Sequence, residues 1–319
     1  MKKAILATLV STLAVSGAAN AATTEIASAE LYGTVGVSYD SHNAQNTDRT
    51  DEINALRNTE FGIRGEVATT GKVSVAYDLR TEFDEADEKA YLSRANITLG
   101  TEFGNLTVGK AESSYDNVTR DFDKFDGHFT SDFEVFDAVD VNETVSFAAT
   151  PVTGLDVALD IAKPESNEAK FGDSYALAAK YSIKSATFSA GYEKADLNEA
   201  DESEAWKIGA GYDFAAMGVD GLSAGLTFEN AEFNKDKVES IGFTAAYDVT
   251  ADITVIAGYA NAEFTAEGAK AEDQNLARFA VDYSITDNVT ATAGFAHIEK
   301  DAKGENNEYM HTVGVKYEF

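Results

Sequence analysis

The chain has 319 residues, no cysteine, 55 acidic and 25 basic residues, and a formal net charge of −30 at pH 7. The absence of cysteine excludes a disulfide framework, a thiolate metal site and a cysteine nucleophile. The negative charge argues against nucleic acid as a partner, because its phosphate backbone would be repelled. Hydrophobic residues make up 44% of the chain and aromatic residues 11%, so it can fold despite its acidity.

The start of the chain has the pattern of a secretory signal peptide. A basic pair, Lys2-Lys3, precedes an apolar core over residues 4–15, and Ala19-Asn20-Ala21 supplies a small-x-small cleavage site. Cleavage one residue later fits as well. The apolar core is too short to act as a membrane anchor. We therefore expect residues 1–21 to be removed and residues 22–319 to form one exported domain.

The remaining chain holds no long apolar segment, which excludes a helical membrane protein. Instead, apolar and polar residues alternate over runs of about ten residues, as in strands that have one apolar face. In residues 72–83, for example, Val73, Val75 and Tyr77 alternate with Ser74 and Ala76. The predicted strands cover residues 29–41, 52–67, 72–83, 90–101, 105–111, 141–150, 154–163, 173–182, 184–194, 204–214, 221–233, 237–249, 252–264, 275–285, 288–299 and 307–319.

The connections between these strands are expected to alternate in length. Short ones lie near residues 69, 103, 152, 183, 217, 250 and 287, and long ones near 46, 86, 125, 168, 199, 235, 270 and 303. An even number of strands with alternating turns and loops predicts an all-β, sixteen-stranded antiparallel up-and-down β-barrel of an outer membrane. A soluble sandwich, solenoid or adhesin also alternates, but here no predicted strand is apolar on both faces.

Residues 112–140 form the longest stretch without alternation. Acidic residues outnumber basic ones in it: Asp116, Asp121, Asp123, Asp126, Asp132, Glu134 and Asp137 against Arg120, Lys124 and His128. Its five phenylalanines would be costly in water, which favours docking against the inner barrel wall over a solvated surface loop. We expect this segment to narrow the pore, with Asp121, Asp123, Asp126, Asp132 and Glu134 as its acidic side.

The basic side is expected on the barrel wall. By alternation, the side chains that point inward are Arg64, Arg80, Arg94, Lys180, Lys207, Arg278 and Lys316. Carboxylates that face guanidiniums would create a field across the pore that orients dipolar solutes. Because the acids outnumber the bases, we expect a net negative lumen and a weak preference for cations. For each base, an ordinary ion pair with a neighbour such as Glu66, Asp78 or Glu82 is the alternative.

Five segments, taken in order, carry a resemblance to a known family. They are Ala29-Glu30-Leu31-Tyr32-Gly33, Phe61-Gly62-Ile63-Arg64-Gly65-Glu66, residues 99–110 (LGTEFGNLTVGK), residues 141–147 (VNETVSF) and the terminal Val315-Lys316-Tyr317-Glu318-Phe319. With them the chain resembles the Gram-negative general diffusion porins. Arg94 stands where the family places an arginine of its pore cluster. Glu60 stands where the family often has another arginine, which is a departure.

The resemblance implies a homotrimer in the Gram-negative outer membrane, whose third external loop folds into each barrel. It implies passive diffusion of small hydrophilic solutes and ions. It also implies that the barrel-insertion machinery reads the terminal aromatic, Phe319. Lipid and lipopolysaccharide would be the other partners.

Other functions are less well supported. A solute-specific porin for a sugar would need aromatic residues in the lumen, and one for phosphate would need clustered lysines. A non-conducting structural or adhesive barrel remains a further alternative. An enzyme is disfavoured, because none of the four histidines can be placed beside a serine and an acid. We expect no cofactor and no specific metal site, although acidic external loops suit diffuse Ca²⁺ or Mg²⁺ binding.

Overall fold

The computed structural model describes residues 26–44, 49–67, 72–84, 89–125, 141–165, 168–198, 201–266, 269–300 and 307–319. The signal peptide expected over residues 1–21 lies outside this part of the chain. No helix in the described part is long and apolar enough to cross a membrane.

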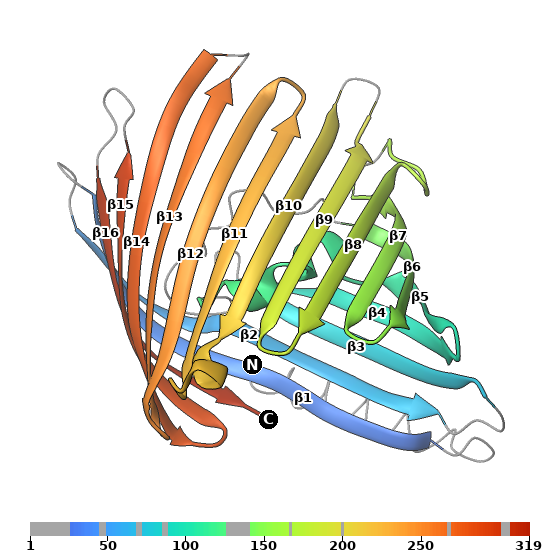
Figure 1. Ribbon diagram of the computed structural model, residues 1–319, viewed down its shortest axis with the longest axis horizontal. Coiled ribbons are helices and arrows are strands. Elements are labelled where there is room, and N and C mark those ends of the chain that lie inside the picture. The colour runs from blue at the N-terminus through green and yellow to red at the C-terminus, as the bar shows by residue number, and fades with distance from the viewer. Residues whose placement is uncertain are drawn as a thin grey trace.

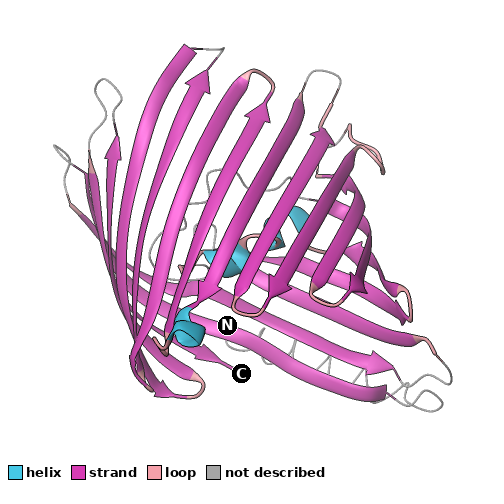
Figure 2. Ribbon diagram, in the orientation of Figure 1, coloured by secondary structure: helices cyan, strands magenta, loops and turns pink. Residues whose placement is uncertain are grey.

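Sixteen strands dominate the described residues (Figures 1 and 2). They are β1 (Ile26–Ala44), β2 (Thr50–Val67), β3 (Ser74–Asp84), β4 (Lys89–Thr101), β5 (Gly104–Lys110), β6 (Val141–Val152), β7 (Leu155–Pro164), β8 (Ser174–Ile183), β9 (Ala186–Asp196), β10 (Glu202–Asp213), β11 (Leu222–Phe233), β12 (Asp236–Thr250), β13 (Ile253–Ala266), β14 (Ala269–Thr286), β15 (Val289–Lys300) and β16 (Glu308–Glu318). Three short helical turns accompany them: α2 (Ser114–Asn117), η1 (Arg120–Phe122) and η2 (Phe214–Met217).

The sheet closes on itself. Each strand pairs with its neighbours in sequence, and β1 pairs antiparallel with β16 in a register that places Val37 opposite Val315. Beyond the end of β16, the amide of Gly33 donates to the carbonyl of Phe319 and the amide of Phe319 donates to that of Gly33, both at 3.0 Å. Closure removes sheet edges, whose unpaired backbone groups would be costly in lipid. The predicted sixteen-stranded antiparallel up-and-down barrel is confirmed.

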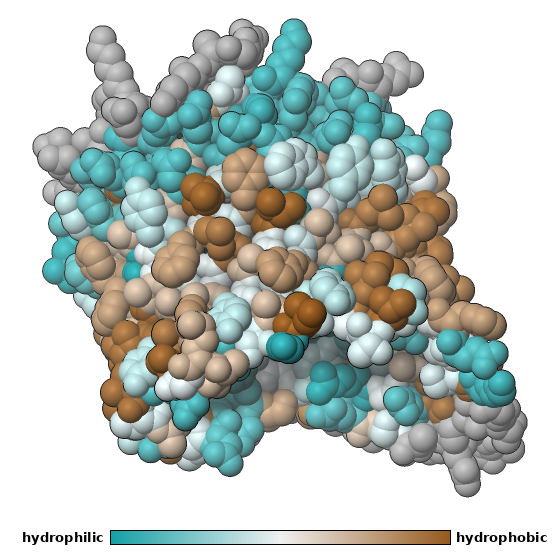
Figure 3. All heavy atoms as spheres, viewed as in Figure 1, coloured by the Kyte–Doolittle hydropathy of each residue, from teal (hydrophilic) through white to brown (hydrophobic). Residues whose placement is uncertain are grey.

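The two faces of the barrel differ in polarity because the strand period is two. In β10, Ala205 and Lys207 are buried on the inner side, while Trp206 and Ile208 are 40% and 49% exposed on the outer side. Figure 3 shows apolar residues across the middle of one outer face, with hydrophilic residues gathered at its upper edge. This distribution suits a barrel whose outer belt lies in the hydrocarbon of a membrane.

The strand boundaries agree with the sequence prediction to within three residues except at the start of β14, which begins at Ala269 rather than near residue 275. The missed residues are rich in charge, and a strand that continues beyond the membrane needs no apolar face. The expected alternation of loop lengths is wrong at four places. The connections near residues 235 and 270, expected to be long, have two residues each, and those near 69 and 217, expected to be short, have six and eight. β11 and β12 are joined by two residues only, and Asn234 adopts the left-handed conformation there (φ 57°), as a tight turn requires.

Candidate channel constriction

After β5 the described chain continues into the barrel interior as residues 111–125. Figure 2 shows the helical turns of this segment within the ring of strands. Ser113 begins α2: its Oγ accepts a hydrogen bond from the amide of Tyr115 at 3.2 Å, which satisfies one of the free donors at a helix start. The turn η1 follows at once. These local bonds give the segment a fixed shape.

Phe122 docks this segment on the inner face of β10 and β11. A Cβ atom at Gly209 or Gly211 would meet the Phe122 ring, and one at Gly225 would meet the backbone of Phe122. The Phe122 carbonyl accepts a hydrogen bond from Thr244 Oγ1 on β12 at 2.6 Å. Glycine is therefore needed at these wall positions, because a side chain would occupy the space of the segment.

Wall carboxylates hold the beginning of the segment. Ser113 Oγ donates to Glu193 (2.8 Å), the Ser114 amide to Asp160 (2.6 Å) and Tyr115 OH to Glu229 (2.6 Å). The three acids come from β9, β7 and β11, so three consecutive residues bridge several strands. Burial, and then the charge of Glu229, raises the pKa of Tyr115. Its hydroxyl thus remains a donor.

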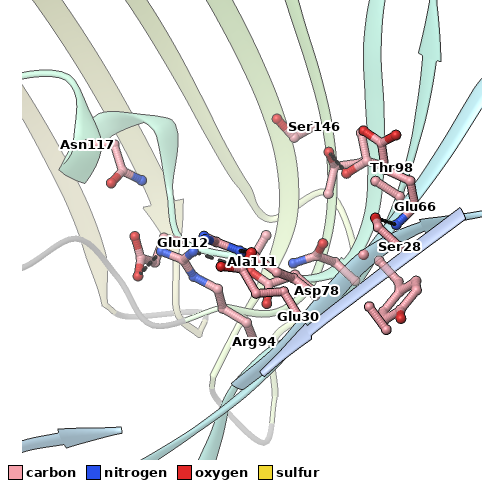
Figure 4. Close-up of a pocket in the computed structure, with 17 residues that line it drawn as sticks. Ser28, Glu30, Glu66, Asp78, Arg94, Thr98, Ala111, Glu112, Asn117 and Ser146 are labelled. Atoms are coloured by element: carbon pink, nitrogen blue, oxygen red, sulfur yellow. Dashed lines mark hydrogen bonds and ion pairs between the residues drawn. The ribbon is translucent and has the colours of Figure 1, made fainter. Parts of the chain in front are cut away.

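Glu112, two residues beyond the end of β5, joins the segment to the opposite wall. Its Oε1 lies 2.5 Å from Nη2 of Arg80 and 2.5 Å from Nη2 of Arg94, and its Oε2 lies 3.0 Å from Nη1 of Arg120. Figure 4 shows Arg94 from β4 beside Glu112. Burial raises the pKa of Glu112, but Arg94 and Arg120 outweigh burial and hold this pKa at about 2. The carboxylate is ionised at neutral pH.

Further acids surround the same arginines. Arg80 contacts Glu60 at 3.2 Å and Glu82 at 2.6 Å, and Arg94 contacts Asp78 at 3.4 Å. Together with Glu112, four carboxylates meet three guanidiniums. We call these seven residues the arginine cluster. Carboxylates exceed guanidiniums by one in this cluster, so its formal charge is negative.

Two cavities of about 750 Å³ and 640 Å³ lie beside Glu112, and both are lined by Glu112 and Asn117. The charged residues that line the larger one are Glu30, Glu66, Asp78, Glu112, Arg64 and Arg94 (Figure 4). Those that line the other are Glu102, Glu112, Asp156 and Lys180. Carboxylates outnumber bases in both, so the open space beside Glu112 has a net negative lining.

The family model for Gram-negative porins matches residues 6–303. The chain belongs to this family. It is therefore an outer-membrane β-barrel protein of Gram-negative type, and family and fold together support a passive channel. None of the curated proteins matches the chain.

Solved porin structures share the fold at low sequence identity. The anion-selective porin from Comamonas acidovorans is 16% identical with a TM-score of 0.79, and the match covers 92% of this chain and 99% of that one. OmpF of Salmonella typhi in complex with daunomycin is 12% identical with a TM-score of 0.72, covering 91% and 97%. OmpT of Vibrio cholerae in its trimer form is 14% identical with a TM-score of 0.70, covering 92% and 99%.

Within this porin five of the expected wall bases contact residues 111–125. Arg80 and Arg94 do so through Glu112 in the arginine cluster, and Lys180, Lys207 and Arg278 do so at other residues of the segment. Lys180 pairs with Asp121, Arg278 Nη2 lies 3.0 Å from Asp123, and Lys207 Nζ lies 4.1 Å from the centre of the Tyr115 ring. Asp121 and Asp123 thus touch their bases instead of facing them across the lumen.

The remaining candidates lie elsewhere. Arg64 pairs with Glu30 at 2.9 Å near one end of the barrel, Lys316 pairs with Glu318 at 3.4 Å, and the Phe319 ring stacks on Tyr317 with centroids 5.6 Å apart. Asp126, Asp132 and Glu134 lie outside the described residues. The inward fold of the complete 112–140 segment and the constriction role of its acids therefore stay predictions, as does the role of Phe319 in insertion.

Sequence reasoning passed over Glu112, Tyr115 and the wall acids Asp160, Glu193 and Glu229 as site residues. Alternation does place the three wall acids on the inner face, but nothing local marks which inward acid meets the loop. Glu112 follows the last alternating residue of a strand, which is the one signal for it. Among the described residues, no three His, Asp or Glu side chains are grouped so that they could hold a metal ion.

Proposed function

We propose that this porin is a passive diffusion channel for small hydrophilic solutes and ions, with a weak preference for cations. The observation that carries the preference is the excess of carboxylates in both cavities beside Glu112. A sixteen-stranded barrel leaves an aqueous lumen instead of a filled core. Selection in such a lumen depends on its width and on the charges that line it.

The arrangement of the arginines supports the same preference. Unpaired guanidiniums in the lumen would attract anions, but each arginine of the cluster lies against at least one carboxylate. The excess acids, Glu66 among them, then determine the sign of the local potential. The Comamonas acidovorans porin is described as anion-selective, and at 16% identity the likeness concerns the fold and not the selectivity.

Reversal potentials in planar lipid bilayers test the preference. The purified full-length mature protein is inserted and a KCl gradient is applied across the membrane. We expect a potential of the sign that K⁺ permeation produces, well below the value for an ideally cation-selective pore. A clear Cl⁻ preference would contradict the proposal, and the absence of any open state would contradict the channel itself.

We further propose that the porin works as a homotrimer, without a catalytic activity or a bound cofactor, and that it contacts lipid and lipopolysaccharide. Its assembly would use the barrel-insertion machinery through the strand that ends at Phe319. External acidic loops would bind Ca²⁺ or Mg²⁺ diffusely. Gel electrophoresis of unboiled and boiled samples tests the assembly: a heat-sensitive band near three times the chain mass is expected, and a monomer band in both lanes would contradict the trimer.

A further inference from the structure

The carboxylate of Glu112 lies among the guanidiniums of three arginines. Arginines recognise carboxylates and phosphates through charge-assisted hydrogen bonds, which are the shortest and strongest of their kind. Here Arg80, Arg94 and Arg120 direct such bonds to one carboxylate and use both of its oxygens. The three arginines come from β3, β4 and η1, so the barrel wall and the inner segment build this cradle jointly.

We propose that Glu112 is a built-in anion that occupies an arginine cradle, and that it thereby keeps small carboxylate and phosphate solutes from binding there. The proposal rests on the channel function proposed above and adds the residue that determines its ion preference. Glu112 lies at the root of the inner segment and lines both cavities. Its carboxylate therefore borders the open space of both cavities.

Two further observations favour this role over that of an ordinary ion pair. The pKa of Glu112 is held at about 2 although burial raises it, so the cradle has a strong intrinsic preference for an anion. In addition, the Nε atom of Arg94 is buried without a hydrogen-bond partner among the described residues. Arg94 thus has one donor that its contacts to Glu112 and Asp78 do not use.

Removing the carboxylate takes away one negative charge and also changes the contacts of the arginines. The cluster then holds three acids, Glu60, Asp78 and Glu82, against three arginines. Glu60 and Glu82 still pair with Arg80, and Asp78 still pairs with Arg94, but all three arginines lose the carboxylate that they share. The donors that pointed at Glu112 then converge on one place. A phosphate or carboxylate solute would find these donors there.

The test compares Glu112→Gln and Glu112→Ala with Glu66→Gln in planar bilayers. Glu66 lines the same cavity and forms no ion pair with the three arginines among the described contacts, so its loss removes one charge and frees no guanidinium. We expect both Glu112 variants to shift the reversal potential toward Cl⁻ by more than Glu66→Gln does. Equal shifts would overturn the proposal, because Glu112 would then act as one lumen charge among others.

A second readout uses inorganic phosphate as the probe, added to both sides in symmetric KCl. Phosphate should reduce the current through Glu112→Ala and leave the parent and Glu66→Gln unaffected. The double variant Glu112→Ala/Arg94→Gln should lose most of this block. Block of equal size in the parent, or no block in Glu112→Ala, would overturn the cradle.

The design separates this inference from the general function and from a folding defect. If the parent channel prefers Cl⁻, the proposed cation preference fails, yet the comparison between variants still tests Glu112. Unboiled gel migration shows whether each variant reaches the folded form. Should Glu112→Ala fail to fold, Glu112→Gln has the same shape and supports the reversal-potential readout.

Discussion

Residues 111–125 are attached to the barrel in two different ways. On the side of β7 to β13 the attachment combines shape, hydrogen bonds and single charged contacts: Phe122 fits against wall glycines, Tyr115 OH donates to Glu229, and Lys180 pairs with Asp121. On the side of β3 and β4 it depends on charge alone, through Glu112 and its arginines. The first side fixes where the segment lies, and the second fixes what potential a passing ion meets.

The largest effect is expected when a side chain fills the space that the wall glycines Gly209, Gly211 and Gly225 leave for Phe122. A side chain in Gly225→Leu would meet the Phe122 backbone, and overpacking of this kind costs about 1–3 kcal/mol. We expect the segment to leave the wall, with a changed single-channel conductance and new tryptic cleavage after Arg120 or Lys124. In the control Gly242→Ala, the added Cβ meets only the Thr227 hydroxyl and, less closely, the Ala260 Cβ. The same cleavage in this control would contradict the claim that the wall glycines are needed to dock Phe122.

Tyr115→Phe should have the next largest effect. The change removes the 2.6 Å hydrogen bond to Glu229 and leaves this half-buried carboxylate with one donor fewer, at a cost of about 1–3 kcal/mol. The midpoint of thermal unfolding in detergent should fall, with little change of ion preference. Tyr181→Phe, on the exposed outer face, is the control. A larger change of reversal potential than of stability would contradict the division between the two sides.

The pH dependence of the charged side is the third test. Because folding lowers the pKa of Glu112 from 4.5 to about 2, its ionised form stabilises the fold above pH 4.5, and this contribution is lost as the pH falls toward 2. The difference in unfolding midpoint between the parent and Glu112→Gln should be constant from pH 7 to 4.5 and shrink below that range. A difference that already shrinks between pH 7 and 5 would contradict the tight ion pairs.

The smallest effect is expected at Glu30 and Arg64. Their ion pair is 2.9 Å long, but both side chains are more than half exposed, and exposed pairs contribute little. Arg64→Gln should leave the unfolding midpoint unchanged within experimental error. Arg80→Gln, whose side chain is 13% exposed and contacts three acids, should lower it clearly. Equal shifts of the unfolding midpoint would show that burial does not determine how much each arginine contributes to stability.

Alternation along the sequence was sufficient for the barrel and for the inward direction of the wall bases, because a period of two assigns every strand residue to a face. Lys180, Lys207 and Arg278 all contact the inner segment as inward residues should. Alternation could not predict contacts of the segment itself. Residues 111–125 have no period, and Glu112 meets its arginines through a chain path that only the folded barrel defines.

The same limit explains the error at the strand ends. The period of two is visible only where one face must be apolar, so it ends where the membrane ends and not where the strand does. The charged start of β14 and the two-residue turn at Asn234 both lie in such a place. Tight turns there depend on the local conformation of single residues, which composition alone does not reveal.

The exchange of hydrogen bonds between Gly33 and Phe319 has a consequence for how the molecule is made. The first strand finds its second partner only in the last strand, so the ring cannot be completed until the whole chain has been delivered. Every earlier intermediate carries two bare edges that can capture another polypeptide. Contacts between such distant parts of a chain also form slowly. The topology therefore requires that these edges be protected while the barrel is assembled.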